Sequence, residues 1–511
     1  MAIAVIDIGM TNKKVAVYTN DLKQIDARYR IFPPQTLDGI EAHDLAAMET
    51  WFAAELGAFA REYPVEAIAV TTHGATFVCV GKDGCPVLPC VYYTHEPGDA
   101  FHAAFYEEFG APETLQEQTG TPAFKALINL AKGIRFAQIR YPESFSRTAR
   151  ILCYPQYWGF RFTGNIGAEG TYMGCHGYLW DQRARRLSSV AHSLGVAPLL
   201  SAGLRNSWDA LGSVAPEFAR KTGLSPKTVV TMGIHDSNSA LLPHFAKKGA
   251  ERFALNSTGT WCVSMNPSEP YGFAPEELGK AVFFNLSAFR TPIKTANFLG
   301  GHEFEAWSRI LMRLHGRDDI PPYDPALCRA VLREKSAFLL PELTAGSGQF
   351  PGSRPRIVEN GREYLFETVS SIGRREDAPP CFQDYGKGFA LLCLSLVMQS
   401  LTGFERIGLA AGTQVFTEGG FRKNRAYNSL LAGALPENRV FLTDIAEASA
   451  LGAAMTAKMA LTGKTLGELS RDLEVAYREV EKDRFPDLPA YRTAWLSLTY
   501  PPASGPPPAV S

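Results

Sequence analysis

Residues 2 to 18 read AIAVIDIGMTNKKVAVY, two apolar runs separated by the short turn Gly9-Met10-Thr11-Asn12. β-branched residues on both sides of such a turn predict a strand, a tight turn and a second strand. Residues 253 to 265, FALNSTGTWCVSM, repeat this arrangement about half a chain later. The repetition predicts a duplicated α/β lobe, with a cleft between the two halves of the protein.

The segments that follow each hairpin have the periodicity of alternating helices and strands. Apolar residues recur at helical spacing in residues 45 to 62, and residues 66 to 71 (EAIAVT) and 228 to 234 (TVVTMGI) form buried-strand patterns. In the second half the patterns predict a strand at residues 414–417 and helices at residues 388–404, 426–435 and 446–461.

The chain divides near its middle. We predict a first lobe over residues 1–245 and a second lobe over residues 246–484. Residues 485–511 end in PPASGPPPAVS, and we expect a partly disordered extension there. Residues 100 to 210 are rich in aromatic residues and helix signals, which is typical of an insertion that could carry a ligand pocket.

The composition is that of a folded globular protein without a nucleic-acid partner. Of the 511 residues, 46% are hydrophobic and 20% are charged, which is enough apolar sequence for large cores. Lys and Arg number 51 and Asp and Glu 52, so the net charge is −1. A nucleic-acid binder needs a basic surplus or stripe to neutralise phosphates, and the sequence has neither.

Neither the cysteines nor the apolar runs indicate an extracellular or membrane protein. The nine cysteines are odd in number and contain no CxxC pair, which indicates reduced thiols. Cys79, Cys85 and Cys90 lack zinc-site spacing, so we expect buried thiols there. The opening residues lack the basic region of a signal peptide, and the longest apolar run, residues 388–398, is shorter than the roughly 20 residues of a bilayer span. We expect a cytoplasmic protein without membrane association.

The first turn places a carboxylate at the end of a buried strand. Asp7 precedes Gly9, Thr11 and Asn12, in a turn whose backbone N–H groups can hold phosphate oxygens while the carboxylate holds a hydrated Mg²⁺. An ordinary hairpin with an aspartate in its turn produces the same pattern. The motif alone leaves both interpretations open.

Two turns in the second half have complementary chemistry. Ser257-Thr258-Gly259-Thr260 offers hydroxyls and a glycine N–H, so that it and the first turn could hold one polyphosphate across the cleft. Glu418-Gly419-Gly420, followed by Asn424, ends a strand pattern and would let a flat ligand approach the backbone closely. Helix capping explains this second motif equally well.

A second acid ends the strand pattern Gly233-Ile234-His235-Asp236. A carboxylate here can accept a hydroxyl proton while that oxygen attacks phosphorus. The alternative is an aspartate that caps a helix beginning at Ser237. Gly463-Lys464-Thr465 imitates the end of a P-loop but has Lys458 where the first glycine is required, so we interpret Gly463 as a helix C-cap.

In their order and spacing these motifs resemble the FGGY carbohydrate kinases of the sugar kinase, actin and chaperone superfamily. The motifs are Asp7-x-Gly9-x-Thr11, Thr72-His73-Gly74, Gly233-x-His235-Asp236, Ser257-Thr258-Gly259-Thr260-Trp261, Glu418-Gly419-Gly420 with Asn424, and Ala450-Leu451-Gly452-Ala453-Ala454. Within the family, the His-Asp pair and the STGTW turn are most similar to the rhamnulokinase and fuculokinase-like members. The resemblance implies two actin-like lobes of the ribonuclease-H-like fold with an interlobe cleft, with sugar bound mainly by the first lobe and ATP by the second.

The resemblance also implies roles for single residues. Asp236 matches the catalytic base, and Asp7 matches the acid associated with Mg²⁺. The matching phosphate positions are Gly9, Thr11, Asn12, Thr258, Gly259 and Thr260, and the matching adenosine positions are Gly419, Gly420 and Asn424. The matching sugar positions are His73, Gly74, His235 and, from a segment that resembles a pocket-lining stretch of the family, Gln156 and Tyr157.

The implied activity is ATP- and Mg²⁺-dependent phosphorylation of a primary hydroxyl on a ketose similar to L-rhamnulose or L-fuculose. Two departures from the family pattern bear on it: Met10 replaces a threonine of the phosphate turn, and residues 92–96 (YYTHE) replace a Trp-x-Asp stretch. Xylulose, ribulose or a four-carbon sugar or polyol are alternative substrates, and a non-catalytic regulator that binds ATP or sugar is the alternative function. A homodimer is the expected assembly because it is the commonest one.

Overall fold

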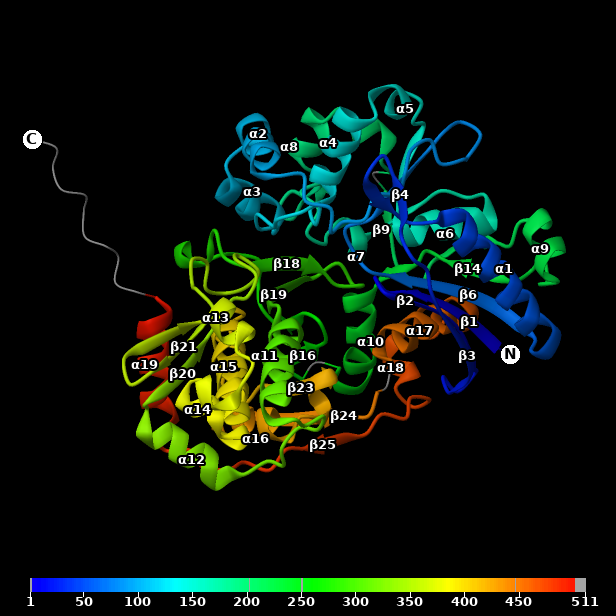
Figure 1. The fold of residues 1–511 in the computed structure, drawn as a ribbon. Helices are drawn as coiled ribbons and strands as arrows, with labels where there is room; N and C mark the ends of the chain where they lie inside the picture. Colours follow the sequence, from blue (N-terminus) through cyan, green and yellow to red (C-terminus); the bar gives the residue numbers. More distant parts are fainter. Residues whose placement is uncertain (1, 202, 250, 446, 501–511) are drawn as a thin grey trace, which may run out of the picture.

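The computed structural model describes residues 2–500 apart from 202, 250 and 446 (Figure 1). Two seven-stranded mixed sheets form the centres of two lobes. The proline-rich end predicted to be disordered, residues 501–511, lies outside the described residues.

The first sheet grows outward from the opening hairpin. β1 (Ala2–Ile8) pairs antiparallel with β2 (Asn12–Thr19), and β2 pairs antiparallel with β3 (Gln24–Ile31). Residues 3 to 6 of β1 are fully buried, as expected of a strand covered on both faces. The remaining strands are β6 (Val65–Thr72), parallel to β1, then β14 (Val229–Thr231), the edge strand β13 (Ala210–Ser213) and the short β15 (Ile234–His235), which pairs with β6.

The second sheet repeats this order. β16 (Phe253–Thr258) and β17 (Cys262–Asn266) form its hairpin, and β19 (Pro292–Phe298) is antiparallel to β17. On the other side of β16 lie the parallel strands β23 (Gln414–Gly419) and β24 (Arg439–Thr443). The edge strands are β18 (Val282–Leu286) and β25 (Tyr477–Glu479). The duplication predicted from the two hairpins is confirmed, since each sheet has three antiparallel strands followed by two parallel ones.

The principal predicted helices are present. α1 (Leu45–Glu62) begins after Asp44, whose carboxylate accepts the N–H of Ala47, and it packs on the first sheet through Phe52 and Leu56. α15 (Tyr385–Arg406) is long and apolar enough to cross a membrane by composition, but 94% of its most apolar window is buried. In this structure α15 is the central core helix of the second lobe. Helix α16 (Arg425–Ala434) matches the prediction at residues 426–435.

Two helices meet where the lobes join. α10 (Asp236–Lys248) follows the first sheet, and α17 (Ala448–Thr462) follows β24. They lie side by side between the sheets (Figure 1), and α17 also packs on β1 and β6 of the first lobe. A Cβ atom at Gly452 would lie 1.9 Å from the Ser239 carbonyl oxygen, so only glycine permits this approach. Gly463 ends α17 with a φ of +69°, which confirms its interpretation as a C-cap.

An insertion between β6 and β14 carries most of the remaining structure of the first lobe. Its helices are α2 (Asp99–Phe109), α3 (Pro112–Thr119), α4 (Leu130–Arg140), α5 (Pro142–Ser146), α6 (Tyr154–Thr163), α7 (Gly170–Met173), α8 (Ser189–Ser193) and α9 (Pro216–Thr222). Helices α2, α3, α4, α5 and α8 lie together at the top of Figure 1, whereas α6 and α9 lie lower, beside α1 and the first sheet. The strands outside the main sheet of this lobe are β4 (Gln35–Leu37), β5 (Ile40–Ala42), β7 (Phe77–Val80), β8 (Arg150–Cys153), β9 (Ala168–Glu169), β10 (Trp180–Asp181), β11 (Arg186–Leu187) and β12 (Leu204–Arg205).

The second lobe has its own additions to its central sheet. Helix α19 buries Tyr491 and Trp495 completely in the second core, so residues 488–499 of the predicted extension are ordered and packed. The added elements are α11 (Gly300–His315), α12 (Pro325–Glu334), the three-stranded sheet β20 (Ala337–Leu340), β21 (Arg356–Glu359) and β22 (Arg362–Leu365), α13 (Phe366–Ser371), α14 (Pro380–Gln383), α18 (Leu466–Leu469) and α19 (Leu488–Thr499).

All nine cysteines are free thiols. Cys79 and Cys90 are buried, as expected, whereas the expectation was wrong for Cys85, which is exposed. Cys85 follows the turn at Asp83 and Gly84 and therefore lies at the surface tip of a hairpin.

Candidate active site

A cavity of about 430 Å³ lies between the lobes and is lined by residues from both hairpin turns. Asp7 and Asp236 line it from the first lobe, and Ser257 and Gly419 line it from the second. A larger hollow of about 970 Å³ lies on the second lobe beside β24 and β25 but contains neither acid. The smaller cavity is therefore the candidate site.

Asp7 occupies the carboxyl end of β1. Its Oδ2 accepts a hydrogen bond of 2.8 Å from the Ser449 hydroxyl at the start of α17, so the acid also links the two halves of the chain. Burial raises the pKa of Asp7 to about 6, against the opposing effects of Ser449 and of the Lys14 charge. The Asp236 charge adds to this rise, because the two carboxylates face the same cavity.

Asp236 begins α10 at the floor of the same cavity. Its Oδ1 accepts hydrogen bonds from the Ser237 N–H at 2.6 Å and from the Ser237 hydroxyl at 3.2 Å. One third of the side chain is exposed, yet burial of the carboxylate raises its pKa to about 6. His235, rather than Asp236, occupies the N-cap position of α10. The acid is thus available to the cavity.

In the turn at residues 9–12, a backbone hydrogen bond from Gly9 to Asn12 joins the two ends of the turn. The Gly9 N–H donates to the Asn12 carbonyl oxygen at 3.0 Å and is therefore already used. Among the described residues, the N–H groups of Met10 and Thr11 donate to no backbone oxygen, and Thr11 and Asn12 are exposed. The free donors of this turn are those of residues 10 and 11.

The two turns of the second lobe are held together by Thr258. Its hydroxyl donates to the Glu418 carbonyl oxygen and accepts the Phe421 N–H at 3.0 Å. Gly419 has a φ of +77°, and a Cβ atom there would lie 1.8 Å from the Thr258 carbonyl oxygen. The Gly259 N–H is likewise used, in a hydrogen bond of 2.9 Å to the Trp261 carbonyl oxygen. The Thr258 hydroxyl therefore holds the two turns together, and its hydrogen bonds within the protein already occupy it.

The outer residues of these turns face solvent. Gly259, Thr260, Gly419 and Gly420 are exposed, so a ligand can reach their backbone. Asn424 has a structural role in addition to any ligand role, because its Oδ1 accepts the Tyr427 N–H at 3.0 Å and caps α16. Helix capping, the alternative that the sequence left open for this motif, is therefore observed.

Buried imidazoles surround Gly74 on the other side of Asp236. His73 Nδ1 lies 2.9 Å from the Gly74 carbonyl oxygen, and its Nε2 has no partner among the described residues. A Cβ atom at Gly74 would lie 2.6 Å from His235 Nε2 and 2.7 Å from the His176 ring. Burial lowers the pKa of His73 and of His235 to about 4, so both rings are neutral at physiological pH.

The segment that begins α6 is only partly at the site. Gln156 donates to the Met232 carbonyl oxygen at 2.8 Å and leaves its buried Oε1 without a partner. Tyr157 instead lies in the hydrophobic core, where its ring centroid is 5.0 Å from that of Trp158. Tyr154 and Tyr93 are aromatic residues at the site, each with its ring centroid 5.4 Å from that of His73. The assignment of Tyr157 to the sugar stays a prediction.

Two residues at the site escaped the sequence analysis. Lys14 supplies the positive charge among the cavity-lining residues, and its ammonium contacts Gln24 at 2.7 Å and pairs with Glu447. Its position in β2, directly after the phosphate turn, was an available signal. His176 comes from a loop of the insertion, and no spacing in the sequence relates it to His73 or His235.

Two sheets of the same order, with acids and glycine turns around a shared cavity, define the two-domain actin-like ATPase fold. The family model described as "FGGY family of carbohydrate kinases, N-terminal domain" matches residues 2–243, and "Carbohydrate kinase FGGY, C-terminal domain" matches residues 250–465. The chain belongs to the FGGY family of carbohydrate kinases, which confirms the resemblance found in the sequence.

Solved structures agree over nearly the whole chain. A carbohydrate kinase from Novosphingobium aromaticivorans is 27% identical with a TM-score of 0.79, over 97% of each chain. A xylulose kinase from Lactobacillus acidophilus, 14% identical, has a TM-score of 0.76 over 98% of this chain and 96% of that one, and shows the fold alone.

Curated relatives match shorter stretches. Ribulokinase 2 of Staphylococcus saprophyticus is 34% identical over 138 residues, 25% of this chain and 24% of that protein. A rhamnulokinase of an Enterobacter species is 22% identical over 238 residues, 45% of each. The chain thus matches between a quarter and about half of the length of these relatives.

Proposed function

We propose that this protein transfers the γ-phosphoryl group of ATP to a primary hydroxyl of a ketose similar to L-rhamnulose or L-fuculose. The observation that carries the proposal is the pair Asp7 and Asp236 in one cavity, bordered by the glycine turns of both lobes. The new bond joins the sugar oxygen to phosphorus, the bond from phosphorus to the departing ADP oxygen breaks, and Asp236 takes the hydroxyl proton.

Asp236 suits the role of general base. A carboxylate with a pKa near 6 is ionised at pH 7 and is still a stronger base than an ordinary aspartate. The hydrogen bonds from Ser237 fix one carboxylate oxygen, Oδ1, and leave Oδ2 for the substrate hydroxyl. Asp236 would therefore orient the hydroxyl before it accepts the proton.

The cavity also suits a magnesium nucleotide. Asp7 and Asp236 repel each other across it, and oxygen ligands of this kind are the ones that Mg²⁺ prefers. We assign Asp7 to the metal, directly or through water. Bound Mg²⁺ supplies neutralisation of phosphate charge. Lys14 adds a fixed positive charge beside the first turn.

Binding of the nucleotide is assigned to the three glycine turns. The exposed turn residues would take the phosphates, with Thr258 ordering the second turn, and the glycines after β23 would accept the adenosine. The assigned phosphate residues are Gly9, Thr11, Asn12, Thr258, Gly259 and Thr260, and the assigned adenosine residues are Gly419, Gly420 and Asn424.

Unpaired polar atoms support a sugar site beside Asp236. His73 Nε2 and Gln156 Oε1 are buried and have no hydrogen-bond partner among the described residues, so a ligand at this place can satisfy them. Sugar hydroxyls would satisfy both. We assign the sugar to His73, Gly74, His235, Gln156 and Tyr157, with Tyr154 as a further aromatic residue beside His73. The names of the relatives, ribulokinase, rhamnulokinase and xylulose kinase, make ribulose and xylulose the alternatives to test.

The deciding experiment is ADP release from MgATP, measured with a panel of ketoses, polyols and aldoses and with a sugar-free control. We expect one ketose to stimulate release strongly, and that sugar would be the substrate. ADP release that stays flat across the panel while ATP binds would instead favour the non-catalytic regulator. Release without any sugar would favour an ATPase of the same fold.

A further inference from the structure

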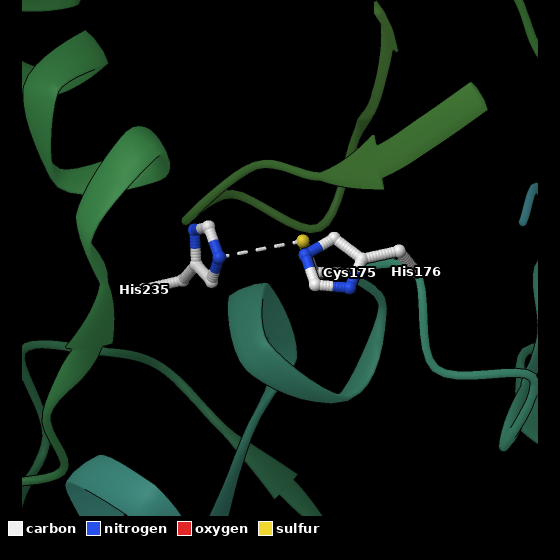
Figure 2. A group of neighbouring side chains, drawn as sticks. All are labelled: Cys175, His176 and His235. Atoms are coloured by element: carbon white, nitrogen blue, oxygen red, sulfur yellow. Dashed lines mark hydrogen bonds between the residues drawn. The ribbon is translucent and has the colours of Figure 1, made fainter. Parts of the chain in front are cut away.

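Three side chains with soft donor atoms converge in the first lobe (Figure 2). Cys175 and His176 follow helix α7, and His235 ends β15. Cys175 Sγ lies 3.5 Å from His235 Nε2, and one donor atom from each of the three residues lies within 4.8 Å of the others. We propose that Cys175, His176 and His235 bind a thiophilic divalent cation such as Zn²⁺.

The outer nitrogen of His176 is placed as in metal sites, whereas that of His235 lies near a carboxylate oxygen without a hydrogen bond to it. His176 Nδ1 lies 3.2 Å from the Ile128 carbonyl oxygen, and His235 Nδ1 lies 3.3 Å from Asp236 Oδ1. A histidine that ligates a metal through one nitrogen usually directs the other to a carbonyl or carboxylate oxygen, which fixes the ring. Both Nε2 atoms are thereby left for the cluster.

The spacing of the donors is close to what Zn²⁺ requires. Bond lengths of about 2.0 Å to nitrogen and about 2.3 Å to sulfur put tetrahedral ligands about 3.3 to 3.6 Å apart. The 3.5 Å between Cys175 Sγ and His235 Nε2 already meets this. The donor atoms of the three residues lie within 4.8 Å of one another, so the His176 ring would have to move inward to reach this spacing.

Gly74 keeps the space beside both rings open. A side chain at this position would begin 2.6 Å from His235 Nε2 and 2.7 Å from His176 Nε2. Any larger residue would occupy the space in which the two nitrogens meet. Binding the cation forms a bond from sulfur to the metal and releases the Cys175 thiol proton to solvent.

The site shares His235 with the proposed sugar site. A cation bound there would occupy part of the sugar's space, so Zn²⁺ would raise the KM for sugar and leave kcat unchanged. This consequence rests on the proposed function, whereas metal binding itself does not.

The test of metal binding uses Co²⁺ alone, added to the purified full chain. We expect visible bands of tetrahedral Co²⁺ with a near-ultraviolet thiolate band, both abolished by one equivalent of Zn²⁺. Cys175→Ser should lose the thiolate band and bind about 100-fold more weakly, and His176→Gln should bind about 10-fold more weakly. Cys85→Ser removes the exposed thiol and is the matched control, with an unchanged spectrum expected.

Two results would overturn the proposal: wild-type protein without a thiolate band, or a band that Cys175→Ser retains and Cys85→Ser loses. Circular dichroism of each variant reports its folding, and His176→Gln decides the matter if Cys175→Ser does not fold. The sugar consequence is tested separately, as competition between Zn²⁺ and the sugar that the panel identifies. Absence of kinase activity would count against the proposed function, and the cobalt spectrum would still decide the metal site.

Discussion

The hairpin turns of the two lobes are equivalent in the fold and different in chemistry. Asp7-Ile8-Gly9 and Ser257-Thr258-Gly259 each end the first strand of their sheet, and each contributes to the same cavity. The first turn carries a carboxylate two residues before its glycine, where the second carries a hydroxyl. Duplication has kept the backbone of the turn in both lobes, while charge is confined to one of them.

The helices that start at the cleft repeat this difference. Asp236 begins α10 and has no Lys or Arg within ion-pair distance among the described residues, whereas Glu447, directly before α17, pairs with Lys14. An unpaired acid can serve as a base, and a paired one is held in place. From this comparison we expect Asp236 on α10 to act as the base and Glu447, before α17, to hold Lys14 in place.

Asp236→Asn should produce the largest effect. We expect kcat to fall by about 10² to 10⁴-fold, because the amide cannot accept the hydroxyl proton, with the Kd for ATP little changed. Steady-state kinetics with the identified sugar and calorimetry with ATP measure the two quantities. Asp318→Asn, at an exposed aspartate, is the matched control. Near-normal turnover in Asp236→Asn would remove this residue as the base.

Asp7→Asn and Ser257→Ala test the asymmetry of the two turns directly. We expect kcat to fall by about 10² to 10³-fold for Asp7→Asn, with a higher Mg²⁺ requirement, and by less than about tenfold for Ser257→Ala. Titration of activity with free Mg²⁺ distinguishes the two variants. Equal losses would mean that the two turns are functionally alike.

The raised pKa values predict an acid limb in the activity profile. Burial raises the pKa of Asp236 to about 6, so below pH 6 the carboxyl is protonated and cannot accept a proton. Asp7, with a pKa also of about 6, is coupled to it. We expect kcat/KM to fall by about tenfold or more per pH unit below 6. A profile that stays flat down to pH 5, in protein shown to be folded, would contradict this assignment.

Gly452→Ala tests the contact between α10 and α17, and its effect is expected on stability rather than on catalytic rate. The added methyl group would collide with the Ser239 carbonyl oxygen, so we expect the free energy of unfolding to fall by about 1–3 kcal/mol. Urea denaturation provides the measurement. Gly467→Ala, where a Cβ atom meets nothing within 4 Å, is the control and should unfold within about 0.5 kcal/mol of the wild type. Two variants of equal stability would show that the helix contact can relax.

Much of the fold could be predicted because its signals are local. The opening hairpin, α1 and α15 each carry their own apolar pattern, and the repeated hairpin revealed the duplication. The sheet β20–β22 and helix α19 were missed, since their pairing and packing depend on contacts far apart in the chain. The predicted division of the chain after residue 245, the cytoplasmic location and the homodimer stay predictions.

The same distinction between local signals and long-range contacts separates the site residues that could be predicted from those that could not. Asp7 and Asp236 could be found because each ends a strand pattern that carries it to the cleft. His176 could not, since it reaches Gly74 through the tertiary arrangement of the insertion.

The insertion between β6 and β14 divides the site residues of the first lobe into two groups. Asp7, Lys14 and Asp236 lie on the central sheet or directly at its end, while Tyr154 and His176 lie in the inserted segment. If the proposed function holds, changes within residues 75–228 alter one part of the sugar site, while Asp7, Lys14 and Asp236 lie outside that stretch. Under that function, a library of variants confined to this one stretch of gene would vary the sugar site while it keeps Asp7, Lys14 and Asp236 in the sequence.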